Sequence, residues 1–199
     1  MKISGEKCFE LEMWMEPKFY AGIGSRDTPE HIQDKMRTIA EILERKKYTL
    51  RSGGAIGADL AFESGVNRNK EIFYTESYRI NDGYYVEYEE SDLQFADKIL
   101  KEYHPAYKPG GNGVKSKGKR QLLSRNTFQI FGVGETKNSE FIVCYTPDGT
   151  ESVTSWETGG TGQAIRVAYD YGIPIYNLKN YIGVTAEEMV EFIMNDMRK

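Results

Sequence analysis

A glycine-rich segment at residues 51–59, RSGGAIGAD, constrains this chain more than any other feature of its sequence. Residues 48–50 before it have the aromatic and β-branched content of a short buried strand, and residues 60–66 after it have the composition of a helix that ends near Gly65. A glycine turn between a strand and a helix lets backbone N–H groups approach an anion, because glycine has no Cβ to obstruct them. The segment therefore favours a phosphate-binding turn, with a tight turn that binds nothing as the alternative.

Asp59 ends this segment and lies at or near the start of the helix that follows. A carboxylate in that position can accept hydrogen bonds from the first helical amides, or it can hold a ribose hydroxyl. The residues of the segment that we expect to contact a ligand are Ser52, Gly53, Gly54, Ala55, Gly57 and Asp59.

A similar turn follows the first strand expected in the core, at residues 18–23. That strand ends in Gly24, Ser25 and Arg26. Thr28 as N-cap, with Pro29 at the first helical position, then predicts the start of a helix.

Two more turns occur nearer the C-terminus. The sequence FIVCY at 141–145 is typical of a strand buried on both faces, and the turn after it contains Thr146 and Asp148. A last glycine-rich segment opens a helix expected at 164–171, and its residues are Gly159, Gly160, Thr161, Gly162 and Gln163.

The other expected elements complete an alternation of strands and helices. They are strands at 70–74 and 173–178 and helices at 91–103, 121–132 and 185–197. This alternation predicts an α/β fold, a Rossmann-like three-layer sandwich with a mostly parallel sheet. Ligands of such sheets bind outside the carboxyl ends of the strands, so the glycine turns should share one rim. Their spacing matches neither GxGxxG nor the GK[ST] of a P-loop, which argues against an ordinary nicotinamide dehydrogenase or ATPase.

The 199 residues are expected to form a single domain. Residues 1–17 mix charged and apolar side chains and would form an N-terminal arm or an edge strand. Residues 76–118 are expected to be an irregular insertion. Within it, the tyrosine-rich and acidic stretch 76–90 has no clean period and should lie close to the ligand face.

The charge balance limits the partners. A net charge of −4 and a pI of about 5.4 argue against a protein that coats nucleic acid, because such proteins neutralise many phosphates with Lys and Arg. The basic cluster, defined as Lys115, Lys117, Lys119 and Arg120, is either a solvated helix start or a contact to phosphate. We therefore expect weak or no binding of single-stranded DNA.

Cysteine and histidine usage points to a cytoplasmic protein without a metal. Cys8 and Cys144 are far apart and outside any CxxC spacing, which fits a reducing cytoplasm. His31 and His104 are isolated, so neither a metal site nor a cofactor is indicated. No apolar run approaches membrane-spanning length, and no membrane association is expected.

In their order along the chain, these motifs resemble a known family. The strings GIGSRDTP at 22–29, SGGAIGAD at 52–59, RN at 125–126, YTPDG at 145–149 and TGGTGQA at 158–164 resemble the Rossmann-like core of the DNA-processing protein A (DprA/Smf) family. That core belongs to the SLOG superfamily, which also contains the Lonely Guy nucleotide phosphoribohydrolases and ligand-sensing domains of antiphage defence proteins. The small DprA-like proteins of bacteriophages are the most similar, and the resemblance covers residues 19–178.

The resemblance implies a rim pocket that binds a nucleotide or a nucleotide-derived phosphorylated small molecule. A phage protein of this kind would act in the host cytoplasm as a sponge that sequesters an immune signalling nucleotide. It also implies a homodimer or a higher homo-oligomer. The expected ligand-binding residues are Gly24, Ser25, Arg26, Ser52, Gly53, Gly54, Ala55, Gly57, Asp59, Arg125, Asn126, Thr146, Asp148, Gly159, Gly160, Thr161, Gly162 and Gln163.

Two other functions remain open. One is a single-stranded DNA-binding recombination mediator of DprA type. The other is a nucleotide N-glycosidase or phosphohydrolase of Lonely Guy type, which would use the glutamate of a PGGxGTxxE motif. When that motif is laid on residues 159–163, its glutamate position falls on Arg166 and its proline position on Thr158. This departure favours binding without turnover, and no catalytic residue is assigned.

Overall fold

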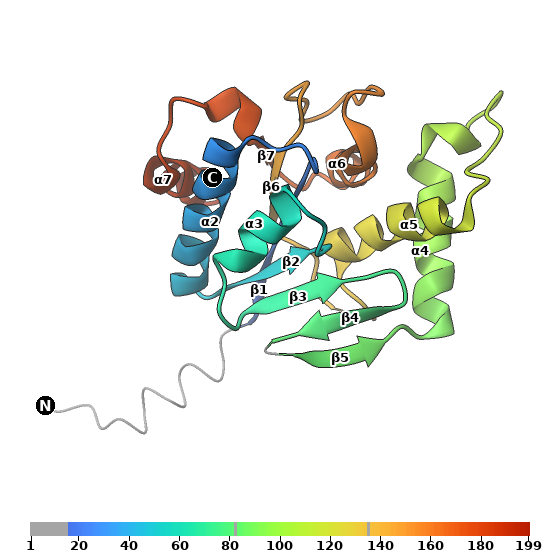
Figure 1. Cartoon of the computed structure of the whole chain (residues 1–199), viewed down its shortest axis with the longest axis horizontal. Coiled ribbons are helices and arrows are strands. Elements are labelled where there is room, and N and C mark those ends of the chain that lie inside the picture. Colours follow the sequence, from blue (N-terminus) through green and yellow to red (C-terminus); the bar gives the residue numbers. More distant parts are fainter. Residues whose placement is uncertain (1–15, 82, 135) are drawn as a thin grey trace, which may run out of the picture.

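The computed structural model describes residues 16–81, 83–134 and 136–199. The arm or edge strand expected at residues 1–17 lies almost entirely outside this part of the chain. The described residues form a seven-stranded sheet in the order β5-β4-β3-β2-β1-β6-β7, with helices on both faces (Figure 1). The expected Rossmann-like sandwich with a mostly parallel sheet is therefore confirmed.

Five of the strands are parallel and two form an antiparallel edge. The parallel strands are β1 (Lys18–Gly24), β2 (Tyr48–Ser52), β3 (Lys70–Phe73), β6 (Phe141–Tyr145) and β7 (Ile175–Asn177). The antiparallel strands are β4 (Ser77–Ile80) and β5 (Tyr84–Glu87).

The helices divide between the two faces of the sheet. Those on one face are α2 (Glu30–Arg45), α3 (Ala58–Ser64) and α7 (Ala186–Asp196). Those on the other are α4 (Glu90–Tyr103), α5 (Lys117–Phe131) and α6 (Gly162–Asp170). Short 3-10 turns are η1 (Pro105–Tyr107), η2 (Gly159–Thr161) and η3 (Leu178–Tyr181). No helix in the described part of the chain is long and apolar enough to cross a bilayer.

The centre of the core is aromatic on one face and aliphatic on the other. All five residues of β6 are buried, as a strand covered on both faces requires. The rings of Tyr20 and Phe141 stack with centroids 5.8 Å apart on the face covered by α2 and α7. On the opposite face, Ile23 and Ile142 pack against α5 and α6.

The prediction of an irregular segment at residues 76–90 was wrong. Strands β4 and β5 form an antiparallel hairpin there, with Tyr78 opposite Val86. Asn81 and Gly83 at its turn have φ angles of 54° and 99°. Asparagine and glycine are the residues that most readily adopt positive φ, so the turn chemistry rather than the periodicity of the strands marks this hairpin.

Two helix starts also differ from expectation. Helix α2 begins at Glu30, and Pro29 is its N-cap. The Thr28 hydroxyl does not cap the helix and donates to the carbonyl of Ser25 at 2.7 Å. Helix α5 begins at Lys117, four residues before the expected 121, and its N-cap Ser116 accepts from the backbone N–H of Lys119. Part of the basic cluster is therefore the first turn of α5.

The strand order predicts where a ligand would bind. The chain runs from β1 outward through β2 and β3, and then returns to β6 on the other side of β1. The connection after β1 leads to β2 on one side, and the connection after β6 leads to β7 on the other side. Connections that diverge in this way leave a crevice at the carboxyl ends of β1 and β6.

Candidate ligand-binding site

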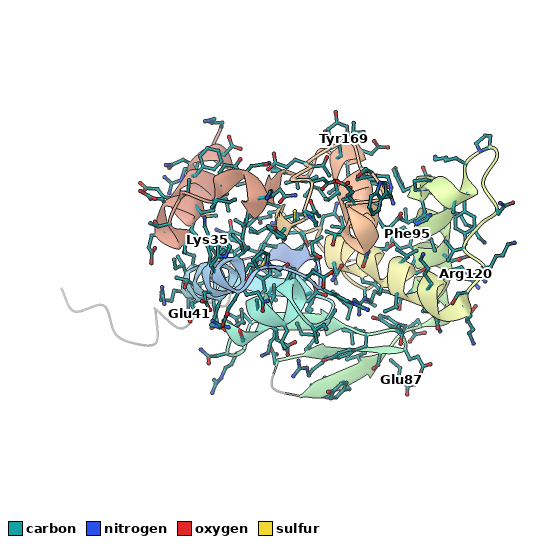
Figure 2. The ribbon with its side chains drawn as sticks, turned by 45° about the horizontal axis from the view of Figure 1, so that its top comes forward. Lys35, Glu41, Glu87, Phe95, Arg120 and Tyr169 are labelled. Atoms are coloured by element: carbon teal, nitrogen blue, oxygen red, sulfur yellow. The ribbon has the colours of Figure 1, made fainter. Side chains whose placement is uncertain are left out.

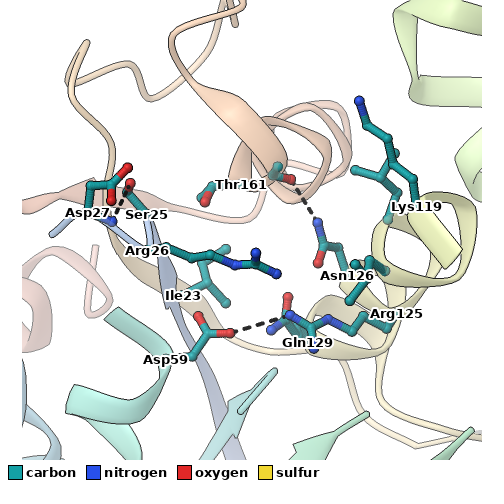
Figure 3. A pocket seen from close by; sticks show the side chains of 13 residues that line it. Ile23, Ser25, Arg26, Asp27, Asp59, Lys119, Arg125, Asn126, Gln129 and Thr161 are labelled. Carbon is teal, nitrogen blue, oxygen red and sulfur yellow. Dashed lines mark hydrogen bonds and ion pairs between the residues drawn. The ribbon is translucent and has the colours of Figure 1, made fainter. Parts of the chain in front are cut away.

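A cavity of about 370 Å³ lies at the carboxyl end of β1 (Figure 3). Its walls come from the turn after β1, the start of α3, one face of α5, and η2. The lining residues are Ile23, Ser25, Arg26, Asp27, Asp59, Lys119, Leu122, Leu123, Arg125, Asn126, Gln129, Gly160 and Thr161.

The turns after β1 and β2 pack against each other and so fix the position of Arg26. The backbone N–H of Ala58 donates to the Ser25 carbonyl at 3.2 Å. Gly57 has φ of 84°, and a Cβ placed on it would lie 2.5 Å from the carbonyl oxygen of Arg26. Only glycine permits both this conformation and this approach. The contact places the backbone of Arg26 at the cavity, with its side chain reaching across it (Figure 3).

The carboxylate of Asp59 contacts the glycine loop that precedes it. Its side chain is buried, and the backbone N–H of Ala55 donates to it at 3.4 Å. Burial raises the pKa of Asp59 to about 6, while Arg125 and the backbone N–H groups of Ala55, Gly24 and Gly53 act in the opposite direction. The backbone N–H groups of the glycine loop, which we expected to bind a phosphate, are therefore close to the carboxylate of Asp59.

Arg125 joins α5 to the glycine loop. Its guanidinium donates to the Gly53 carbonyl at 2.6 Å and lies 3.7 Å from a carboxylate oxygen of Asp59. Its Nε is buried and has no partner in the part of the chain that the structure describes. Burial lowers the pKa of Arg125, Asp59 raises it, and the nearby charge of Arg26 lowers it.

Arg26 completes the positive side of the cavity. Within residues 16–81, 83–134 and 136–199, its guanidinium makes no hydrogen bond or ion pair. It repels Arg125 across the cavity, and an anion between the two guanidinium groups would remove that repulsion.

Asn126 connects the cavity to the last glycine-rich segment. Its side-chain amide donates to the Gly160 carbonyl at 2.8 Å, and this bond orients the amide oxygen for a further contact (Figure 3). Apolar side chains of Ile23, Leu122 and Leu123 also line the cavity. The lining can therefore contact both a phosphate and the less polar part of a ligand.

The expected site residues occupy three kinds of position. The cavity lining contains Ser25, Arg26, Asp59, Arg125, Asn126, Gly160 and Thr161. Behind that lining, Gly24 ends β1, Ser52 ends β2, and the glycine loop contains Gly53, Gly54, Ala55 and Gly57. Away from the lining are Thr146, Asp148, Gly159, Gly162 and Gln163.

Three of the residues away from the lining have side-chain hydrogen-bond partners. Thr146 accepts a hydrogen bond from Asn177 at 2.6 Å. Asp148 accepts from the hydroxyls of Ser155 and Thr158, and these bonds lower its pKa although burial alone would raise it. Gln163 accepts from Arg166 at 3.1 Å.

Sequence reasoning missed Leu122, Leu123 and Gln129 as lining residues, whereas it named Lys119, in the basic cluster, as a possible contact to phosphate. Lys119, Leu122, Leu123 and Gln129 join Arg125 and Asn126 on the face of α5 turned to the cavity. Residues spaced by three and four positions share one face of a helix, so extending the expected helix toward 117 would have brought Lys119 and Leu123 onto the face of Asn126.

The raised pKa of Asp59 predicts pH-dependent anion binding. Above about pH 6 the charged carboxylate neutralises Arg125 and repels an anion, and below it the protonated form does neither. We expect affinity for a nucleoside phosphodiester, whose own charge does not change here, to rise about tenfold between about pH 8 and pH 5. Calorimetric titrations across this range measure it.

The Asp59→Asn variant separates this effect from other titrating groups, including His104. Its affinity should vary less with pH than that of the wild type. An equal pH dependence in both proteins would show that Asp59 does not control the anion.

Comparison with solved structures identifies a similar fold. DNA processing protein A from Helicobacter pylori, reported with a unique mode of single-stranded DNA binding, matches with a TM-score of 0.54 and 16% sequence identity. The match covers 91% of this chain and 82% of that one. No protein-family model and no curated protein matches the sequence. The chain therefore has a DprA-like fold, and its function rests on the site itself.

Proposed function

We propose that the cavity binds a nucleotide or a nucleotide-derived phosphorylated small molecule. The observation that carries this proposal is the pair of guanidinium groups, Arg26 and Arg125, which face one cavity and repel each other. Guanidinium forks match the oxygens of a phosphate in pairs. A phosphate between them would offset the repulsion and take up the free donors of both side chains.

The size and lining of the cavity support this ligand class. A volume of about 370 Å³ falls within the range of roughly 300–1,000 Å³ that is usual for small-molecule sites. Its apolar side chains, including Leu122 and Leu123, suit a base, and its polar groups suit a phosphate and a ribose. The position at the reversal of strand order is where α/β sheets bind nucleotides.

We further propose that the ligand is sequestered rather than consumed. Arg166 stands at the position of the Lonely Guy glutamate, and its guanidinium donates to the Tyr103 carbonyl at 2.9 Å. A positively charged side chain cannot supply a general base at that position. A phage-encoded sponge for an immune signalling nucleotide would need only binding.

The test is calorimetric titration of the purified protein with a panel of nucleotides. Replacement of Arg26 by Ala should weaken the binding of the best ligand by about 1.5–3 kcal/mol, the scale of a charge-assisted hydrogen bond. The matched control is Arg45→Ala, which removes an exposed arginine from the last turn of α2. Equal affinities in wild type and Arg26→Ala, or no binding of any nucleotide, would contradict the proposal.

Single-stranded DNA binding is the second candidate, and the basic cluster favours it. Lys117 and Arg120 line a separate cavity of about 440 Å³ on the other side of α5, which shares Arg125 with the first cavity. Figure 2 shows Arg120 and Phe95 at the end of the molecule opposite Lys35 and Glu41. The DprA structure with a similar fold is reported to bind single-stranded DNA.

Charge argues for weak DNA binding. Four phosphate contacts from the basic cluster would give a log–log salt slope of only about −3. We expect little binding of an oligonucleotide at about 150 mM salt, measured by fluorescence anisotropy. Submicromolar binding that disappears when the basic cluster is neutralised would establish the second candidate instead.

A homodimer also remains part of the proposal. Tyr84 and Tyr85 are exposed on β5, at the edge of the sheet, and offer one surface for association. Sedimentation velocity should show the dimer at micromolar concentration, whereas a monomer would count against it.

A further inference from the structure

A second compartment adjoins the ligand cavity. It has a volume of about 570 Å³ and shares Lys119, Leu123 and Gly160 with the first. Gly160 lines both compartments, and a Cβ added to it would meet no atom within 4 Å, so there is free space beside this residue. The lining residues are His104, Pro105, Lys119, Leu123, Thr154, Ser155, Trp156, Gly159, Gly160 and Arg166, and none of these described residues is acidic.

Arg166 brings an uncompensated charge to this compartment. Its guanidinium donates to the Tyr103 carbonyl at 2.9 Å, to the Gln163 side chain at 3.1 Å and to the Thr154 hydroxyl. All of these acceptors are neutral, and no described carboxylate pairs with Arg166. Burial lowers its pKa to about 10, which leaves it charged at neutral pH. A half-buried guanidinium without a counter-ion attracts an anion.

The pKa of His104 is consistent with a positive potential in this compartment. Its pKa is lowered first by burial and then by the charges of Arg166 and Lys119. The compartment therefore carries two cationic side chains and a histidine held toward its neutral form. In a chain with a net charge of −4, this concentration of positive charge on one cavity is a local feature of the site.

Trp156 provides an aromatic wall. Its side chain lines the compartment and is 87% exposed, so its indole has little packing against the rest of the chain. The loop that carries it is tied down, because Ser155 and Thr158 both donate hydroxyl hydrogen bonds to Asp148. A fixed loop that presents an uncovered indole beside two cations is suited to stack on a nucleobase.

We propose that the two compartments hold one dinucleotide, with one phosphate between Arg26 and Arg125 and the second phosphate and base at Arg166 and Trp156. This inference rests on the proposed nucleotide-binding function and adds that a mononucleotide fills only half of the site. The linkage between the two halves would pass Gly160, which lines both compartments and has free space beside it.

The experiment compares AMP with the dinucleotide pApA by calorimetry. The wild type should bind pApA at least tenfold more tightly than AMP, because pApA adds a charged contact and a stacked base. Trp156→Ala and Arg166→Gln should each reduce this preference while the affinity for AMP is unchanged. Trp156→Phe should retain the preference, and Arg26→Ala should weaken the binding of both ligands.

The outcomes separate this inference from the proposed function. If AMP binds and pApA binds no tighter, or if the preference survives both Trp156→Ala and Arg166→Gln, the dinucleotide is excluded and nucleotide binding stands. If neither AMP nor pApA binds, the dinucleotide proposal fails, and the titrations with the nucleotide panel decide the proposed function. Trp156 is exposed, so its replacement does not endanger folding even if that of Arg166 does. Affinity that continues to grow with longer oligonucleotides would assign the site to a DNA strand instead.

Discussion

Replacement of Glu71 by Ala is expected to lower the free energy of unfolding by about 3–5 kcal/mol. Glu71 lies beside Arg51 on neighbouring parallel strands, and its carboxylate accepts from the Arg51 Nε at 2.7 Å. The Arg51 side chain is fully buried, and its guanidinium also stacks 3.7 Å from the ring centroid of Phe19. Without Glu71 the guanidinium would be a buried charge without a counter-ion. Chemical denaturation measures the change.

The controls isolate the buried charge. Glu87→Ala removes an exposed carboxylate from β5 and should change stability by less than about 0.5 kcal/mol. The double variant Arg51→Met with Glu71→Leu should recover most of the loss, because a matched apolar pair needs no counter-ion. A cost below about 1 kcal/mol for Glu71→Ala would mean that the backbone carbonyl of Lys137 and the hydroxyl of Thr136 are sufficient partners for the buried Arg51 guanidinium.

Replacement of Gly57 by Ala should destabilise the fold by more than about 3 kcal/mol and abolish ligand binding. The new methyl group would lie 2.5 Å from the Arg26 carbonyl and 2.6 Å from that of Ser25. These are backbone atoms, so the two turns must separate to make room. Their separation would displace Arg26 from the cavity. Denaturation and nucleotide titration measure the two effects together.

Gly172→Ala is the matched control for this variant. Gly172 has φ of 66°, and a Cβ there would meet no atom within 4 Å. Its replacement therefore carries the backbone penalty of about 1–2 kcal/mol without a steric clash. If Gly57→Ala costs no more than Gly172→Ala and still binds nucleotide, the close packing of the two turns does not form the site.

The alternation of strands and glycine turns was sufficient to predict the fold. Because β1, β2 and β6 are parallel neighbours, the turns that follow them lie at the same edge of the sheet, independent of their side chains. The hairpin at β4 and β5 was missed because its residues do not alternate cleanly between apolar and polar. Its strands are stabilised by aromatic contacts instead, such as that of Tyr78 with Tyr88, whose ring centroids are 5.5 Å apart. Such contacts depend on tertiary structure.

The role of the glycine loop could be predicted only in part. Its composition predicted a phosphate-binding turn, with a tight turn that binds nothing as the alternative, and in the structure the backbone N–H of Ala55 donates to the carboxylate of Asp59. Sequence cannot distinguish a loop that receives a ligand phosphate from one that receives its own side chain, since both need the same glycines. Arg51, at the start of the same motif, faces the interior and pairs with Glu71. The positive charge at the cavity comes from Arg26, Arg125 and Lys119.

The central claim is that the cavity between Arg26 and Arg125 holds a phosphorylated nucleotide. Mass spectrometry of small molecules released by denaturing the natively purified protein tests it most directly, with Arg26→Ala prepared in parallel. We expect a phosphorylated nucleotide derivative close to one per chain from the wild type, and a marked reduction from the variant. Release of no phosphorylated compound, or of equal amounts from both proteins, would contradict the claim.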